Sequence, residues 1–310
     1  MSEFVHIPVL YKEVLEGLNV KPEGVYVDGT LGGGGHAKGI AERLTTGRLI
    51  ANDLDPEAIA AAKEKLGALA QKVIFVHDDY KNITKHLDEF GIDKVDGILL
   101  DLGVSSYQID TAERGFSYMK DAPLDMRMDR ENGGLCAADI VNHYSAAELT
   151  KLFEEYGEEK FAKKIASDIV RARVKKPIQT TGELSELICA TYPVGFKFGH
   201  PAKRVFQALR IETNGELEGL YKAIEGMTRR LKPGGRMCVI TFHSLEDRIV
   251  KTCFKQLEID CVCDKNVPVC VCGKVSEIKL INKKPIEASE EELKLNKRAE
   301  SAKLRIIEKK

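Results

Sequence analysis

Polar side chains follow four short apolar runs in the first third of the chain. They are Asp28, then Asn52 and Asp53, then Asp78, Asp79 and Tyr80, and finally Asp101. In an open parallel sheet, ligands bind beyond the carboxyl ends of the strands. Carboxylates placed there can accept hydrogen bonds from ribose hydroxyls or amines. Together these residues predict a site for a nucleoside-containing ligand, although any one of them alone is equally typical of a helix cap or turn. For Asp55 we prefer the cap.

A glycine run, Gly32–Gly35, lies between Asp28 and a helix-like stretch that begins at His36. Glycines let a ligand approach the backbone, and the helix N-terminus favours a negative group; a flexible surface loop has the same composition. Asp53 lies about 20 residues further on, as expected for an acid that holds two ribose hydroxyls. NAD and S-adenosylmethionine both suit such a site. The run lacks the Gly-x-Gly-x-x-Gly spacing that pyrophosphate binding favours.

Strands and helices alternate up to Asp101, which predicts an α/β fold with a parallel sheet. We expect strands over 25–28, 48–53, 72–77 and 95–101. From about Gly103 to Asn214 the apolar spacing is helical, with capping boxes at Ser145/Glu148 and Thr180/Glu183. A strand is expected again over 237–242, followed by a helix that starts with Ser244 as its cap. An antiparallel edge pair is expected over 277–281 and 302–307. The pattern predicts an α/β domain interrupted by a helical insertion.

Composition narrows the class of protein. The chain has 310 residues, of which 43% are hydrophobic and 31% charged, and its formal net charge is −1. No apolar run approaches the roughly 20 residues of a membrane span. The first residues lack the features of a secretory signal, so we expect a cytoplasmic protein with no membrane partner. With a net charge near zero, any RNA binding must depend on local basic patches.

Two Cys-x-Cys pairs, Cys261/Cys263 and Cys270/Cys272, stand out among eight cysteines that otherwise fit a reducing compartment. Four thiolates could surround one tetrahedral zinc ion. However, the usual spacing in zinc sites is Cys-x-x-Cys, and we favour free cysteines with a structural role. A structural zinc stays possible, and we assign no metal ligand.

Longer motifs carry a resemblance to a known family. They are His6–Leu10 (HIPVL), Asp28–His36 (DGTLGGGGH), Val95–Ser106 (VDGILLDLGVSS), Arg114–Ser117 (RGFS), Pro123–Asp129 (PLDMRMD), His200–Ala202 (HPA), Phe206–Ile211 (FQALRI) and Phe242–Arg248 (FHSLEDR). In type and order they closely resemble the bacterial 16S rRNA cytosine-N4 methyltransferase family, over nearly the whole chain.

The resemblance implies a seven-stranded Rossmann-like methyltransferase sheet with an inserted all-helical domain. We expect the methyltransferase domain over 1–108 and 215–310 and the substrate-recognition domain over 109–214. It also implies 16S rRNA, within the small ribosomal subunit, as substrate and S-adenosylmethionine as methyl donor. The family's contacts to this donor fall on Gly34, Gly35, His36, Asp53, Tyr80, Asp101 and Gln108. Tyr80 stands where the family more often has Phe, and its ring still offers an aromatic face to adenine.

Asp101 is the expected catalytic residue. Cytosine N4 is a poor nucleophile because its lone pair is conjugated into the ring, so an acceptor must hold its protons and align it with the methyl group. Asp101 could be that acceptor or could hold the donor's amino group. The alternative is a cap on the turn that follows at Leu102–Ser105. His243, at the end of another expected strand, could order the RNA or cap the next helix with Ser244, and it is left out of the catalytic residues.

Basic residues crowd one expected helix and the segment after it. They are Lys160, Lys163, Lys164, Arg171, Arg173, Lys175 and Lys176, followed by Lys197, Lys203, Arg204 and Arg210. Alone they would indicate a solvated helix face, whereas the resemblance favours contacts to RNA phosphates. Rival functions are an NAD-dependent dehydrogenase and a non-catalytic RNA-binding assembly protein. The sequence leaves the oligomeric state, the exact cytidine and the assembly stage open.

Overall fold

The computed structural model describes residues 8–193, 199–264 and 269–310, and it divides into two compact units. One unit, the sheet unit, contains residues Met1–Gly103 and Gly219–Lys310, and the other, the helical unit, contains Val104–Glu218. These divisions lie a few residues from the domain limits expected from the sequence. His6 and Lys197, singled out above, lie outside the described residues.

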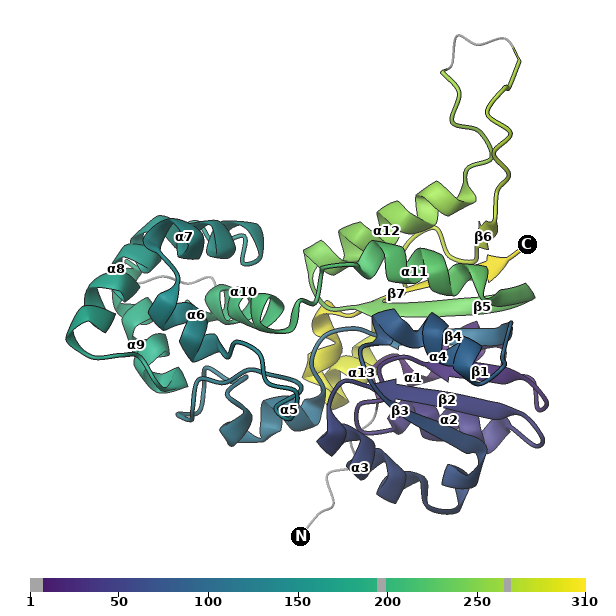
Figure 1. The fold of residues 1–310 in the computed structure, drawn as a ribbon, viewed down its shortest axis with the longest axis horizontal. Helices are drawn as coiled ribbons and strands as arrows, with labels where there is room; N and C mark the ends of the chain where they lie inside the picture. The colour runs from purple at the N-terminus through teal and green to yellow at the C-terminus, as the bar shows by residue number, and fades with distance from the viewer. Residues whose placement is uncertain (1–7, 194–198, 265–268) are drawn as a thin grey trace. The chain divides into compact units, whose positions relative to one another are not determined.

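The sheet unit is built on seven strands in the order β3-β2-β1-β4-β5-β7-β6 (Figure 1). They are β1 Val25–Asp28, β2 Arg48–Asp53, β3 Val73–His77, β4 Val95–Asp101, β5 Leu231–Thr241, β6 Ile278–Leu280 and β7 Lys303–Lys309. The first five strands are parallel, whereas β7 runs antiparallel to β5 and to β6. The strand order reverses between β1 and β4, which is where open sheets bind ligands. The expected seven-stranded α/β sheet is confirmed.

Helices cover both faces of this sheet (Figure 1). One group is α1 Tyr11–Leu18, α2 Gly35–Arg43 and α3 Pro56–Leu66; the other is α4 Ile83–Glu89, α11 Leu220–Arg229 and α12 Ser244–Glu258. Asp55 caps α3 by accepting from the Glu57 amide, with Pro56 in the first turn. A short helix, α13 Glu290–Leu295, begins after the predicted cap Ser289. Capping residues in the sequence therefore predicted the starts of α3 and α13 correctly.

Two expectations in this unit need correction. Helix α12 starts at Ser244 as expected, but its capping box is formed by His243 and Glu246 and not by Ser244 and Asp247: the His243 ring accepts from the Glu246 amide, and the Glu246 carboxylate accepts from the His243 amide. Strand β5 also starts earlier than expected, at Leu231. Its first residues pair irregularly with β4, where the register shifts between Val95 and Gly97. Residues 232–235 lie opposite the single residue Asp96, and Gly234 has a φ of +75°, so the turn that the proline and glycines indicate is kept as a bulge inside the strand.

The helical unit contains α5 Ser106–Asp110, α6 Ala137–His143, α7 Ala146–Glu155, α8 Ala162–Lys175, α9 Thr181–Thr191 and α10 Ala202–Asn214. Both predicted capping boxes are present: the Glu148 amide bonds Ser145, and the Glu183 amide bonds Thr180. The unit has its own core, in which Phe153, Ile165 and Leu209 are fully buried. Across the described residues of the whole chain, no helix combines the length and apolar character needed to cross a bilayer.

Candidate active site

Three carboxyl groups gather at the carboxyl edge of the sheet. Asp28 ends β1, Asp53 ends β2 and Asp101 ends β4. Strand β1 lies between the other two, with Asp28 paired to Ala51 of β2 and Leu99 of β4. Among the described residues, none of the three acids forms an ion pair with Lys or Arg. The site is therefore acidic and lacks an internal cation.

Asp101 has one oxygen without a partner. Its Oδ1 is buried and unbonded in the described structure, while Oδ2 lies 3.8 Å from Nε2 of His36. The backbone amide of Asp101 donates to Thr30 Oγ1 at 2.6 Å, which fixes the strand end. Burial, followed by repulsion from Asp28 and Glu246, raises the pKa of Asp101 to about 8. A carboxyl group in this state favours a ligand that brings a positive charge.

Asp28 is the most deeply buried of the three acids. Its Oδ1 accepts from the Thr30 amide at 3.2 Å, and its Oδ2 has no partner. Burial raises the pKa of Asp28 to about 7; the bond from Thr30 opposes this shift and the charge of Asp53 adds to it. Burying a carboxyl group with an unsatisfied oxygen is unfavourable, so its presence at this strand end points to a ligand.

Asp53 fixes the glycine turn to β2. Its Oδ2 accepts from the Gly32 amide at 2.7 Å and its Oδ1 accepts from the Asp55 amide at 2.9 Å. Burial raises the pKa of Asp53 to about 6, against the lowering effect of these amides. Each carboxylate oxygen has a second lone pair, so the expected bonds to ribose hydroxyls remain available. Asp53 therefore has a structural task that the sequence did not reveal.

The glycines of the turn are required for two different reasons. Gly34 has a φ of +73°, and a Cβ there would lie 2.9 Å from the Cβ of Ala62; a Cβ on Gly35 would lie 2.3 Å from Cγ of Pro8. These two glycines let α2 pack closely against its neighbours. A Cβ on Gly33, in contrast, would meet no atom within 4 Å. The open side of the turn is thus at Gly33, which the sequence analysis did not select.

His36 lies in the first turn of α2 and is buried. Neither of its ring nitrogens forms a well-aligned hydrogen bond within the described residues, and its ring stacks on Tyr11 with centroids 6.0 Å apart. Burial lowers the pKa of His36 to about 4, against the raising effect of a weak interaction with the Val9 backbone. The imidazole is therefore neutral near pH 7 and can act as a donor or an acceptor.

Tyr80 and Gln108 lie in different units. Tyr80 begins a short 3-10 helix, η2 Tyr80–Asn82, and its Cβ lies 3.3 Å from the position that a Cβ on Gly29 would occupy. That places Tyr80 beside the end of β1. Gln108 belongs to the helical unit, where it is buried and forms a capping box with Ser105. A contact between Gln108 and the methyl donor stays a prediction.

The other strand-end polar residues have structural partners. Asp78 Oδ2 lies 2.7 Å from His86 Nε2, and Asp79 caps η2 through the Lys81 amide. Asn52 donates to the carbonyl oxygens of Gly29 and Asp78. These residues shape the edge of the sheet around the three acids.

Two residues of the site were missed by the sequence analysis. Thr30 contacts both Asp28 and Asp101 through its amide and hydroxyl. Glu246 is buried, and its Oε2 accepts from the Phe242 amide at 2.9 Å. The spacing of His243 and Glu246, three residues apart, was the available signal for a capping box at the end of β5.

Family motifs in the helical unit mainly build its structure. The buried Arg114 donates from Nη2 to the carbonyl oxygens of Arg127 and Met128. A Cβ on Gly115 would lie 2.3 Å from the carbonyl oxygen of Pro123. The RGFS and PLDMRMD segments therefore hold each other in place.

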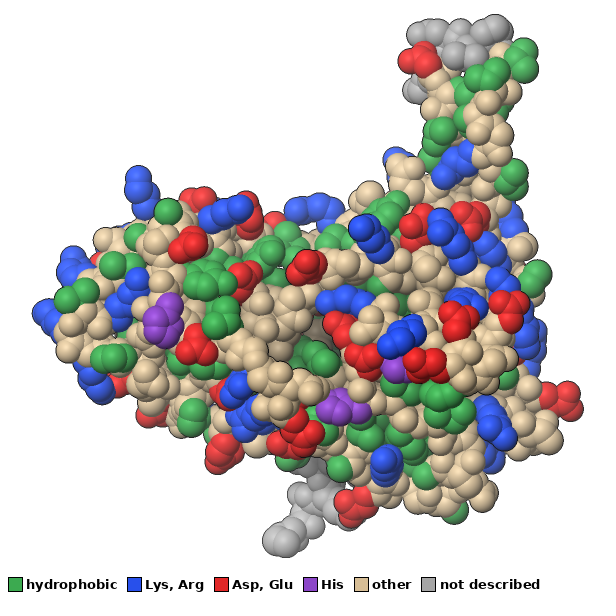
Figure 2. Space-filling model, in the orientation of Figure 1, with side chains coloured by type: hydrophobic (Ala, Val, Ile, Leu, Met, Phe, Trp, Pro, Cys, Tyr) green, Lys and Arg blue, Asp and Glu red, His purple; other side chains and the backbone are tan. Residues whose placement is uncertain are grey.

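The basic residues around α8 fall into two groups. Lys164 donates to the Thr191 carbonyl at 2.8 Å, Arg173 to the Val141 carbonyl at 2.6 Å, and Arg171 pairs with Asp168. Lys160, Lys163 and Lys175 are exposed and have no hydrogen bond or ion pair within the described residues. Figure 2 shows Lys and Arg along the side of the helical unit where α8 lies in Figure 1, with acidic residues between them.

Comparison with known proteins identifies the family. The model of the MraW methylase family matches residues 3–310. A ribosomal RNA small subunit methyltransferase H from Clostridium botulinum (strain Kyoto / Type A2) is 57% identical over 309 residues, covering 99% of each chain. A protein of the same name from Lachnospira eligens is 55% identical over 311 residues, covering 99% of this chain and 98% of that protein. Another from Clostridioides difficile (strain 630) is 52% identical over 310 residues, covering 99% of each chain. The chain belongs to the MraW methylase family.

Proposed function

We propose that this chain transfers a methyl group from S-adenosylmethionine to N4 of a cytidine in the 16S rRNA of the small ribosomal subunit. Membership of a methylase family supports the reaction type. The names of the relatives, small-subunit rRNA methyltransferases, support the substrate. The choice of N4 of cytidine depends on the motif resemblance described above.

The observation that carries this proposal is the cluster of three acids without a cation. S-adenosylmethionine is positively charged at its ammonium and sulfonium groups, which suits carboxyl groups whose pKa values are raised by burial and by neighbouring carboxylates. A dinucleotide would instead bring the negative charges of a pyrophosphate to the same acids. The electrostatics of the site therefore favour a methyl donor over NAD.

The residues expected to contact the methyl donor each have a place in this proposal. Asp53 accepts from the ribose hydroxyls, and the Tyr80 ring covers one face of the adenine. The backbone amides of Gly35 and His36 are available at the start of α2, next to Gly34, whose own amide donates to the Leu31 carbonyl. Asp101 presents its unbonded Oδ1 to an N–H donor. Bound S-adenosylmethionine supplies an electrophilic methyl group, and Gln108 is the contact proposed from the helical unit.

The target nitrogen explains why an acceptor is needed. An N–H of cytosine N4 held by a carboxylate loses freedom, and the lone pair can then be directed at the methyl carbon. The base must also be unstacked before a protein can reach its edge. Asp101 is the acceptor candidate; its alternative task is to hold the donor's ammonium group. The two tasks predict different kinetics for Asp101→Asn: loss of kcat for the first, and a raised KM for the donor for the second.

The test is methyl transfer to small ribosomal subunits that lack this modification. Subunits purified from a strain with the gene deleted are incubated with the protein and labelled S-adenosylmethionine, and the rRNA nucleosides are separated by mass spectrometry. We expect the label in N4-methylcytidine. Methylation at another atom would refute the N4 assignment. Binding of the subunit with no methyl transfer would indicate a non-catalytic assembly protein.

A further inference from the structure

The segment between α12 and β6 extends away from the rest of the sheet unit (Figure 1). It leaves α12 after Glu258 and reaches β6 at Ile278, and its base is closed by a bond from the Glu277 amide to the Leu257 carbonyl. Residues 259–264 form one arm and residues 269–277 the other. Residues 265–268, which include Pro268, lie outside the described part of the chain.

The two arms have no hydrophobic core of their own. Their valines are exposed to solvent: Val262 by 57%, Val269 by 70%, Val271 by 81% and Val275 by 76%. Segments of this size without buried apolar side chains need a cross-link or a metal to hold one conformation. Something other than apolar burial must therefore fix the arms.

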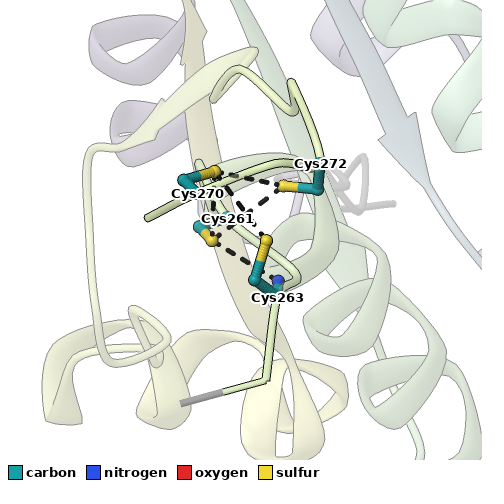
Figure 3. A group of neighbouring side chains, drawn as sticks. All are labelled: Cys261, Cys263, Cys270 and Cys272. Atoms are coloured by element: carbon teal, nitrogen blue, oxygen red, sulfur yellow. Dashed lines mark hydrogen bonds between the residues drawn. The ribbon is translucent and has the colours of Figure 1, made fainter. Parts of the chain in front are cut away.

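Four cysteine side chains converge between the arms, two from each (Figure 3). The Sγ of Cys270 lies 3.5 Å from those of Cys261 and Cys272 and 3.9 Å from that of Cys263, and the sulfurs of Cys261 and Cys272 are 3.9 Å apart. In a tetrahedral site with Zn–S bonds of about 2.3 Å, neighbouring sulfurs are about 3.8 Å apart. The spacing of the thiols matches the edges of that tetrahedron.

The backbone supports the same arrangement. The Val262 amide of one arm lies 3.4 Å from the Cys272 sulfur of the other, and the Val271 amide lies 3.4 Å from the Cys263 sulfur. The middle residue of each Cys-x-Cys pair thus donates to a sulfur across the gap. Such bonds hold thiolate ligands in orientation and offset part of their negative charge.

Disulfides do not account for this geometry. A disulfide joins two sulfurs at about 2.05 Å. Here all four cysteines are free, and the Sγ–Sγ distances given above lie between 3.5 and 3.9 Å. An arrangement of two disulfides would contain two short pairs, whereas one central ion gives equal spacings.

We propose that Cys261, Cys263, Cys270 and Cys272 bind one zinc ion, which fixes the two arms in place of a hydrophobic core. Each thiol loses its proton when the ion binds, and zinc undergoes no redox change. With four protein ligands the coordination sphere is closed, so the ion is structural. The sequence analysis left this possibility open and favoured free cysteines because of the short Cys-x-Cys spacing. The proposal is independent of the methyl-transfer reaction.

The test is metal analysis of the full chain purified without a metal-affinity step. We expect one zinc per chain in the wild type and in the matched control Cys189→Ser, which removes an exposed free cysteine of the helical unit. The double variant Cys263→Ser and Cys270→Ser should contain no zinc but still bind S-adenosylhomocysteine in calorimetry. Limited proteolysis should cut residues 259–277 in the double variant and spare them in the wild type.

A second measurement on the wild type covers the case in which the double variant does not fold. X-ray absorption at the zinc edge should give four sulfur neighbours at about 2.3 Å. Nitrogen or oxygen ligands would overturn the proposal. So would zinc retained in the double variant, iron in place of zinc, disulfides among the four cysteines, or metal-free wild-type protein with four reactive thiols.

Discussion

Asp101 Oδ2 lies 3.8 Å from His36 Nε2, yet the two groups do not form an ion pair near neutral pH. Burial raises the pKa of Asp101 to about 8 and lowers the pKa of His36 to about 4. Between these values the carboxyl group is protonated and the imidazole is neutral. Asp101 is therefore not neutralised by His36, and its carboxyl group can lose its proton when a cationic ligand binds beside it.

Proton release is the first expected consequence. A ligand ammonium beside Asp101 lowers its pKa, so binding at pH 7 should release about one proton per site. S-adenosylhomocysteine carries the ammonium group and serves as the ligand. Calorimetry at pH 7 in buffers of different ionisation enthalpy should show a slope that disappears in alkaline buffer and shrinks in Asp101→Asn. Binding heats that are independent of the buffer would contradict this prediction.

Asp101→Asn should also stabilise the ligand-free protein at high pH. The unfolded carboxyl group loses its proton near pH 4 and the folded one near pH 8, so in this window the folded state binds more protons and stability falls as pH rises. The side-chain amide of Asn does not titrate, so the variant does not lose stability in this way as the pH rises. Because Asp101 is 26% exposed, we expect a gain of about 1–3 kcal/mol at pH 8 and little change at pH 4.

Urea unfolding at both pH values, together with methyl-transfer assays, checks this prediction. The variant should fold and melt at least as well as wild type while losing turnover. A variant that is less stable at both pH values would show that the carboxylate acts as a cap on the following turn.

Asp53→Ala should weaken cofactor binding and loosen the glycine turn. The change removes the acceptors of the Gly32 and Asp55 amides and those proposed for the ribose. Each charge-assisted bond contributes about 1.5–3 kcal/mol. Calorimetry with S-adenosylhomocysteine should show a loss of that size, whereas the control Asp79→Asn, at a cap beside the site, should bind normally. Lower stability with unchanged affinity would assign Asp53 to the turn alone.

The sequence predicted elements well where local chemistry determines them. The β2 strand over 48–53, the cap at Asp55 and both capping boxes depend on residues close in the chain. It failed where a distant partner decides the outcome. Strand β5 begins at Leu231 because Leu231 pairs with Val95 of β4, while the Pro and Gly that follow form a bulge before the pairing resumes at Arg236.

The same distinction applies to the site. The sequence identified Asp28, Asp53 and Asp101 as site residues from their positions at the ends of predicted strands, because the carboxyl ends of parallel strands meet at one edge of the sheet. The partners of those acids could not be read from spacing. Thr30 Oγ1 contacts the Asp101 amide across 71 positions, and the burial that shifts each pKa depends on the assembled sheet. For Asp78 and Asp79 only the structure shows that local partners take up the carboxylates.

The exposed lysines around α8 give the last prediction. Lys160, Lys163 and Lys175 have no hydrogen bond or ion pair within the described residues, so they are available to phosphates. Lys164 and Arg173 instead bond carbonyl oxygens of the helical unit, and reversing their charge would also disturb the fold. The triple change of the three free lysines to Glu should therefore raise the KM for the small subunit without altering the melting temperature.

Salt dependence separates phosphate contact from a general charge effect. Each lost phosphate contact removes about one counterion-release contribution, so the slope of log affinity against log salt should become shallower by up to about three. The control reverses Lys12, Lys85 and Lys222, three exposed lysines of the sheet unit. It changes the net charge equally and should leave the slope nearly unchanged. Equal slopes in wild type and the α8 variant would show that these lysines only solvate the helix.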